Sequence, residues 1–148
     1  MSNIQKYSEI FNYLSAPELP TEAHPTVVFG RQDPLVAQAA GNLIVANLAD
    51  TLVITGGIGK DTGSIRKQGF RTEADYLNQQ LQDDAEQRGY DLSTVRVLLE
   101  RKAKTGNQNA RNSVRLLQSS ERLDRLTAVA HAVSIAKHGP IAPLLMEI

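Results

Sequence analysis

A short, continuously apolar run that ends on two glycines constrains the fold of this chain more than any other feature. Residues 51–55 read TLVIT, with three aliphatic side chains in succession, and Gly56 and Gly57 follow at once. A strand without polar alternation is expected where helices cover both faces of a sheet, as they do in parallel sheets. The run therefore predicts a buried strand of an α/β protein.

Strands and helices alternate along most of the chain. We expect strands at 26–29, 51–55 and 94–99, and helices that begin after Pro34, after Thr72 and near Ala110. This alternation is typical of a Rossmann-like three-layer αβα sandwich with a mostly parallel sheet. The stretch 126–137 fits either a strand or a helix, and we favour a strand followed by a short helical tail.

The N-terminal 25 residues differ in character from the rest. Apolar residues at helical spacing span 4–14, and Pro17, Pro20 and Pro25 then favour an extended linker. We therefore divide the chain into an N-terminal helix and Pro-rich linker at 1–25 and one α/β domain at 26–148.

The composition excludes several classes of function. Sixteen Lys and Arg balance sixteen Asp and Glu, so charge gives no reason to expect nucleic-acid binding. The absence of cysteine excludes disulfides and thiolate catalysis. The sequence has no apolar run of about 18 residues and no signal-peptide pattern, so we expect no membrane span and a cytoplasmic location.

The glycine-rich segment 56–63, GGIGKDTG, matches no complete phosphate-binding motif. Lys60 is followed by Asp61 where a Walker A loop has serine or threonine, and the third glycine of a dinucleotide fingerprint is missing. Glycines after a strand still allow backbone amides to approach an anion or a ribose closely, although the segment taken alone is better explained as a plain flexible turn. The three histidines lack metal-ligand spacing.

The expected parallel sheet brings three loops to one edge. Crossover connections place the carboxyl ends of all strands together, and ligands of such sheets bind just beyond those ends. The loops concerned are 30–33, 56–71 and 100–107. Gly30 and Arg31 belong to the first of them, and Gly56 and Gly57 open the second.

Three patches in these regions resemble the YdcF-like family of bacterial proteins. They are VITGGIGKDTG at 53–63, RTEADYL at 71–77 and LLERKAKTGNQNARNSVRLL at 98–117. The family similarly has a strand that closes on serine or threonine and two glycines, and a helix that starts with Arg, Glu and Ala. Its third pattern begins with a strand-ending Glu. The matching residues here are Arg71, Glu73, Ala74, Glu100, Thr105, Asn109, Ala110, Arg111 and Ser113.

The resemblance covers about 26–117 and implies a ligand more firmly than a reaction. It implies a Rossmann-like domain that binds S-adenosylmethionine or a nucleotide, with transferase activity as an extension. A non-catalytic regulatory or assembly module linked to cell-envelope metabolism is the alternative. The expected ligand-binding residues are Gly30, Arg31, Gly56, Gly57, Arg71, Glu73, Glu100, Thr105, Asn109, Arg111 and Ser113.

Several of these residues also have structural interpretations. Glu73 would stabilise the start of a helix through the macrodipole, and Glu100 could pair with a neighbouring cation such as Arg101. Thr105 or Asn107 could cap the third helix, and Asn109 with Ser113 could support the loop.

The two arginines allow two interpretations as well. Arg71 and Arg111 could hold a ligand carboxylate or the two glutamates. A third function, acid–base chemistry by Glu73 and Glu100, requires those carboxyl groups to meet.

The C-terminal part departs from the family pattern. AHAVSIAKHGP at 130–140 lacks the Asp-Pro-type loop that follows the fourth strand in relatives. We therefore expect an open cleft, a cleft covered by a second subunit, or a reduced and inactive version. An exposed sheet edge favours a homodimer.

Overall fold

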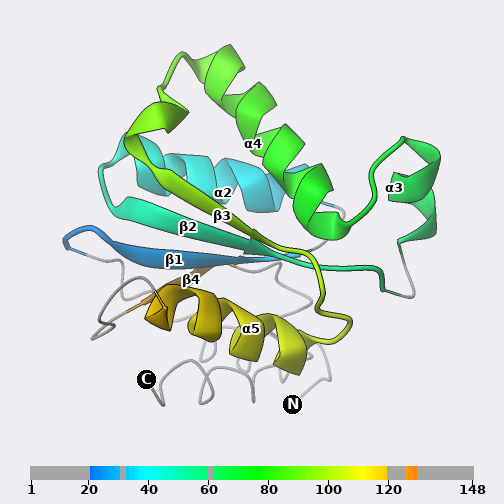
Figure 1. Cartoon of the computed structure of the whole chain (residues 1–148). Helices are drawn as coiled ribbons and strands as arrows, with labels where there is room; N and C mark the ends of the chain where they lie inside the picture. The colour runs from blue at the N-terminus through cyan, green and yellow to red at the C-terminus, as the bar shows by residue number, and fades with distance from the viewer. Residues whose placement is uncertain (1–20, 31–32, 60–61, 120–125, 130–148) are drawn as a thin grey trace, which may run out of the picture.

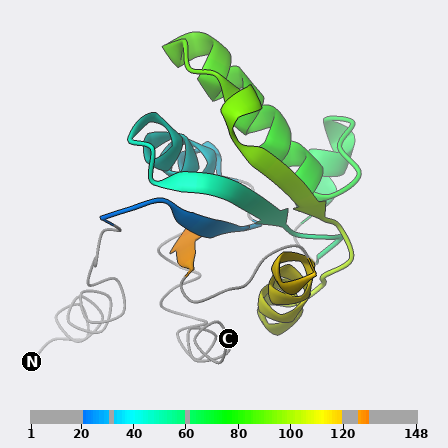
Figure 2. The same ribbon diagram turned by 60° about the vertical axis from the view of Figure 1, so that its left-hand side comes forward.

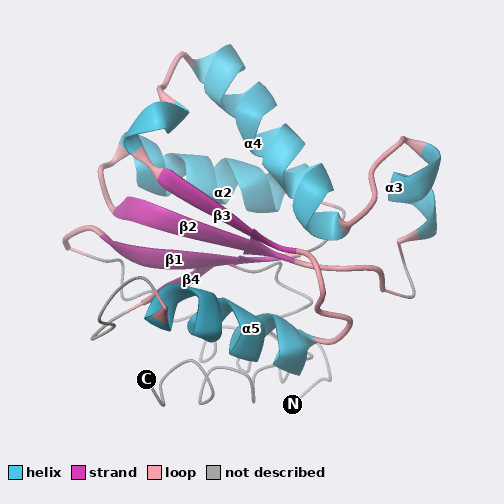
Figure 3. Ribbon diagram, viewed as in Figure 1, coloured by secondary structure: helices cyan, strands magenta, loops and turns pink. Residues whose placement is uncertain are grey.

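The computed structural model describes residues 21–30, 33–59, 62–119 and 126–129. These residues form an α/β structure with a four-stranded, all-parallel sheet flanked by helices, consistent with a Rossmann-like αβα fold (Figures 1 and 3). The expected fold class is therefore confirmed.

The sheet has the strand order β3-β2-β1-β4. In the register, Val27 of β1 lies beside Val53 of β2 and Ala128 of β4. Because β2 and β3 lie on one side of β1 and β4 lies on the other, the chain reverses its direction of winding between β1 and β4. Such a switch point is where open parallel sheets bind ligands. The strands are β1 His24–Phe29, β2 Ala49–Thr55, β3 Arg96–Glu100 and β4 Thr127–Val129.

Helices cover both faces of this sheet (Figures 1 and 2). α2 (Pro34–Val45) and α4 (Glu73–Arg88) pack side by side on one face, and α5 (Gly106–Gln118) packs on the other. The short α3 (Gly63–Lys67) lies beyond the sheet edge, between β2 and α4, and a single 3₁₀ turn, η1 (Leu92–Thr94), precedes β3. No helix among the described residues combines the length and apolar character that crossing a bilayer requires.

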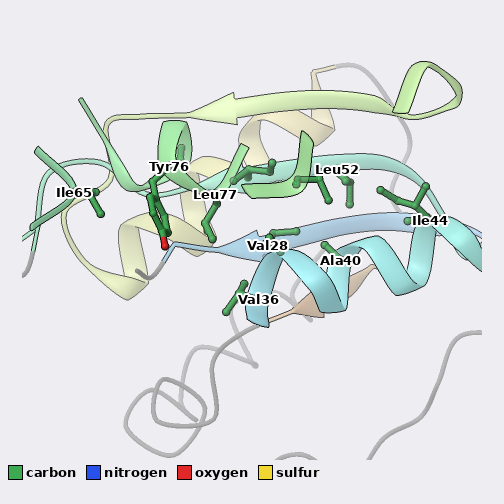
Figure 4. Close-up of a cluster of buried hydrophobic side chains, with 13 residues drawn as sticks. Val28, Val36, Ala40, Ile44, Leu52, Ile65, Tyr76 and Leu77 are labelled. Carbon is green, nitrogen blue, oxygen red and sulfur yellow. The ribbon is translucent and has the colours of Figure 1, made fainter. Parts of the chain in front are cut away.

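The unbroken apolar character of β1 and β2 follows from this two-sided cover. Successive side chains of a strand point to opposite faces. Val28, Leu52 and Ile54 join the cluster under α2 and α4, whereas Val27 and Val53 join the cluster under α5. Figure 4 shows Val28 and Leu52 among side chains of α2 and α4, including Val36, Ala40, Ile44 and Leu77.

The helices α4 and α5 are capped by residues that the sequence indicates. Thr72 accepts a hydrogen bond from the Asp75 amide at 3.1 Å, and Gly89 ends α4 in the left-handed conformation at φ 72°. Thr105 caps α5 by accepting from the Gln108 amide at 3.3 Å. The Gln108 side chain accepts in return from the Lys104 amide at 2.8 Å. This exchange resembles a capping box.

Some expected boundaries were wrong. β2 begins at Ala49 and β1 at His24, two residues earlier than expected in each case, whereas Thr94 belongs to η1 and not to β3. The loop expected over 56–71 contains α3. The expected helix at 4–14 and the tail from 130 onwards lie outside the described residues.

Candidate functional site

Glu73 lies over the ends of β1 and β2, where glycines leave room for its side chain. A Cβ atom on Gly30 would come within 2.8 Å of the Glu73 Oε2 atom and 2.5 Å of the Thr55 carbonyl oxygen. A Cβ on Gly56, whose φ is 152°, would lie 2.8 Å from the Glu73 Cβ. A Cβ on Gly59 would lie 3.9 Å from Oε1. Three glycines therefore surround this half-buried carboxylate.

The diglycine turn connects α4 to the loop that follows β3. The Gly56 carbonyl accepts from the Ala74 amide at 2.9 Å, and the Gly57 carbonyl accepts from the Glu73 amide at 3.3 Å. The Gly57 amide donates to the Ala103 carbonyl at 2.8 Å, and a Cβ on Gly57 would lie 2.5 Å from that oxygen. These contacts fix the turn and use the first two amides of α4, so those amides are not available to an anion.

Glu100 is the central acceptor of the loop after β3. Its side chain is buried, with 5% of its surface exposed. Oε1 accepts from the Lys102 amide at 2.8 Å, the Ala103 amide at 3.2 Å and Asn112 Nδ2 at 3.2 Å. Oε2 accepts from the Thr55 hydroxyl at 2.8 Å. With both oxygens engaged by the protein, Glu100 holds the loop in place.

Asn109 and Ser113 lie one turn apart on α5, as expected, but in different surroundings. The Asn109 Oδ1 atom lies 3.0 Å from the Thr55 hydroxyl, so Asn109 shares Thr55 with Glu100. Ser113 is completely buried, and its hydroxyl oxygen has no hydrogen-bond partner in the described part of the chain. Asn109 therefore reaches the edge of the site, whereas Ser113 lies beneath it.

The remaining predicted residues do not gather at one point. Thr105 is occupied as the cap of α5, and Asn107, the alternative cap, lies inside that helix. Arg111 is exposed on α5, which packs on the sheet face opposite α4 (Figure 1). Arg31 lies outside the described residues.

Arg71 lies in a hollow that the sequence did not reveal. This hollow has a volume of about 420 Å³ and is lined by Gly69, Phe70, Arg71, Thr72, Asp75 and Arg101. Arg101 Nε donates to Asp75 Oδ1 at 2.8 Å. Neither partner was predicted for the site, because no sequence pattern indicates that the residue after Glu100 meets the first turn of α4.

The charges of the hollow act on Asp75. Its partial burial raises the pKa, but hydrogen bonds from Arg101 and Thr72 and the positive charges of Arg101 and Arg71 outweigh that effect and lower the pKa below its usual 3.8. Asp75 is therefore ionised at neutral pH, and the Arg101–Asp75 pair is a true ion pair.

In the described part of the chain, no three histidine or acidic side chains are placed to hold a metal ion. Comparisons of the chain with protein-family models, with curated proteins and with solved structures found no match. The geometry of the carboxyl edge therefore carries the functional argument.

Proposed function

We propose that the carboxyl edge of the sheet binds a small ligand with a ribose, either S-adenosylmethionine or a nucleotide. The observation that carries this proposal is the position of Glu73, whose carboxylate lies among Gly30, Gly56 and Gly59 at the ends of β1 and β2. β1 borders the switch point of the sheet, where ligands of this architecture bind. The resemblance to the YdcF-like family suggests S-adenosylmethionine among the ligands with this chemistry.

A ribose suits this surrounding for a chemical reason. An ionised carboxylate only accepts hydrogen bonds, and the two hydroxyls of a ribose diol are donors. Glycine at positions 30 and 56 lets this carboxylate pack against the turn, because a Cβ at either position would collide with Glu73. In this proposal Glu73 accepts from the diol, and the sugar lies beside Gly30 and Gly59, which are partly exposed, whereas Gly56 is buried beneath Glu73.

The network below the turn supplies rigidity. Glu100 ties the Thr55 hydroxyl and the Lys102 and Ala103 amides together, and Asn109 contacts the same hydroxyl. Binding sites depend on neighbouring groups that fix their geometry before the ligand arrives. In the proposal, Glu100 and Asn109 position the turn that Glu73 borders. The saturated environment of Glu100 argues against the paired acid–base function considered from the sequence.

Calorimetry and thermal shift with S-adenosylmethionine, S-adenosylhomocysteine and ATP test the proposal. A ligand present at about 100 times its dissociation constant should stabilise the protein by roughly 2.7 kcal/mol. Glu73→Gln should weaken binding about tenfold or more, because it removes the negative charge and replaces one acceptor oxygen with an NH₂ donor.

Glu86→Gln is the matched control, because Glu86 is an exposed residue of the same helix. It should leave the affinity unchanged. Absence of any ligand-induced shift at millimolar concentration would contradict the proposal, and so would equal effects of the two variants.

A further inference from the structure

We propose that the hollow between Arg71 and Arg101 is a separate oxyanion site, which takes the phosphate or carboxylate group of a small molecule. The hollow lies at the start of α4, beside the loop that follows β3, and measures about 420 Å³. The inference does not depend on the proposed function, because inorganic phosphate alone can test it.

The first support is the balance of charge. Two guanidinium groups, Arg71 and Arg101, and one carboxylate, Asp75, line the hollow, so two positive charges less one negative charge leave one net positive charge. The chain as a whole is neutral. Asp75 offsets one of the two positive charges, and a bound anion would offset the other.

The second support is the geometry of Arg101. Its Nε atom donates to Asp75 at 2.8 Å, which uses one edge of the guanidinium. A guanidinium carries five N–H donors in a planar fork that matches carboxylate and phosphate oxygens. The ion pair therefore orients Arg101 and leaves the two terminal amino groups as donors for another acceptor.

Thr72 fixes Asp75 in turn. The Thr72 hydroxyl donates to Asp75 Oδ2 at 2.8 Å and accepts from the Asp75 amide at 3.1 Å. Thr72 thus fixes Asp75 at the start of α4, and Asp75 in turn binds Arg101 in the loop after β3. The arrangement joins α4 to the β3–α5 loop and sets one of the two arginines in place before an anion arrives.

Phe70 gives the hollow an apolar wall. Its ring meets the Tyr76 ring edge to face, with the centroids 5.4 Å apart, and packs against the main core. A wall held in this way excludes water from one side of the hollow and strengthens the interaction of a guanidinium with an anion. The amides of the first turn of α4 do not contribute, because Gly57, Gly56 and the Thr72 side chain already accept from them.

The experiment is a titration of isotope-labelled protein, followed by the backbone amide signals of residues 69–75 and the arginine side-chain N–H signals. Inorganic phosphate, acetate and chloride are added separately at equal ionic strength. We expect saturable shifts at these positions. Saturation by phosphate alone assigns the site to phosphate groups, and saturation by acetate assigns it to carboxylates.

Two variants locate the effect. Arg71→Gln should weaken anion binding about tenfold, whereas Arg111→Gln, which removes an exposed arginine from the opposite sheet face, should leave it unchanged. Shifts that do not saturate, or that chloride reproduces, would overturn the site, and so would equal weakening by both variants. If phosphate binds but no ribose ligand does, this site stands and the proposed function fails. If a ribose ligand binds but phosphate does not, the proposed function stands and this site fails.

Discussion

Replacing Glu100 tests whether the loops at the carboxyl edge depend on one buried side chain. Four donors converge on its carboxylate, from Thr55, Lys102, Ala103 and Asn112, at distances of 2.8 to 3.2 Å. Glu100→Ala would leave all four without this acceptor. A buried donor left without its acceptor costs about 1–3 kcal/mol, so losing the acceptor shared by these donors should cost about 3 kcal/mol or more. Since a domain of this size is stable by roughly 5–15 kcal/mol, the loss would be easy to measure.

Glu100→Gln should cost much less, about 1 kcal/mol. The amide oxygen can take the place of Oε1 and keep the donors from Lys102, Ala103 and Asn112. The amide nitrogen would then replace Oε2 and donate to the Thr55 hydroxyl, which lies 3.0 Å from Asn109 Oδ1 and can donate there instead. The difference between the two variants therefore measures the acceptor at Oε1.

The assay is urea unfolding followed by circular dichroism, with the change in free energy taken from the shift of the midpoint. Glu86→Ala on the exposed side of α4 should stay within about 0.5 kcal/mol of the parent. The reasoning is refuted if Glu100→Ala falls within about 1 kcal/mol of the parent, or if the glutamine and alanine variants cost the same.

Further outcomes follow from other contacts. Gly56→Ala should destabilise the protein by roughly 1–3 kcal/mol, because the new Cβ would collide with Glu73 and because the φ of 152° at this position disfavours a side chain. Gly63→Ala should not destabilise it, because the space around Gly63 is open. The midpoints of urea unfolding test both expectations. The lowered pKa of Asp75 means that its charge stabilises the fold above about pH 3.8, and this contribution is lost as the pH falls through the folded-state pKa. In Asp75→Asn the free energy of unfolding, measured by urea unfolding at a series of acid pH values, should therefore fall less steeply as the pH decreases. Burial and the hydrogen bond to Asp84 raise the pKa of Tyr90 from 10.0 to about 12. The neutral phenol therefore stabilises the folded state below pH 10, and this contribution is lost as the pH rises through 12. In Asp84→Asn the phenolate absorbance of Tyr90 should appear at a lower pH than in the parent.

Elements with strong local signals could be predicted from the sequence. α4 is the clearest case, because Thr72 caps its start and Gly89 ends it in the left-handed conformation. β2 was found from its apolar run, although its first two residues, Ala49 and Asp50, gave no signal for a strand. These features depend on residues close together in the chain, so local physics determines them.

Local hydrogen bonding displaced other expected boundaries. Asp91 accepts from the Ser93 amide and hydroxyl at 2.8 Å each, and its carbonyl accepts from the Thr94 hydroxyl at 3.0 Å. This turn holds Thr94 in η1 despite its preference for strands. In the loop after β2, Thr62 similarly accepts from the Gly59 amide at 2.5 Å directly before α3. Propensity alone could not indicate either turn.

The candidate site was predicted in part, and the reason lies in tertiary contacts. Glu73 and Glu100 were selected because both match the patterns of the YdcF-like family, and Glu100 also because it ends a strand. Only the folded chain shows that the Lys102 and Ala103 amides turn back onto Glu100, or that Arg101 crosses to Asp75 of α4. Each of these contacts joins groups whose positions depend on how α4 and the β3–α5 loop pack together.

The two glutamates thus have different tasks at one edge. Glu100 is 5% exposed and meets four protein donors, so its charge is used to hold the backbone of the loop. Glu73 is half-buried, and its side chain fills the room that the missing side chains of Gly30 and Gly56 leave at the ends of β1 and β2. A Cβ on Gly30 would lie 2.5 Å from the Thr55 carbonyl oxygen, and one on Gly56 would lie 2.8 Å from the Glu73 Cβ, so a larger residue at either position would collide with the protein. The glycines therefore position a partly exposed carboxylate at this edge, and the proposed ligand would bind on the exposed side of that carboxylate.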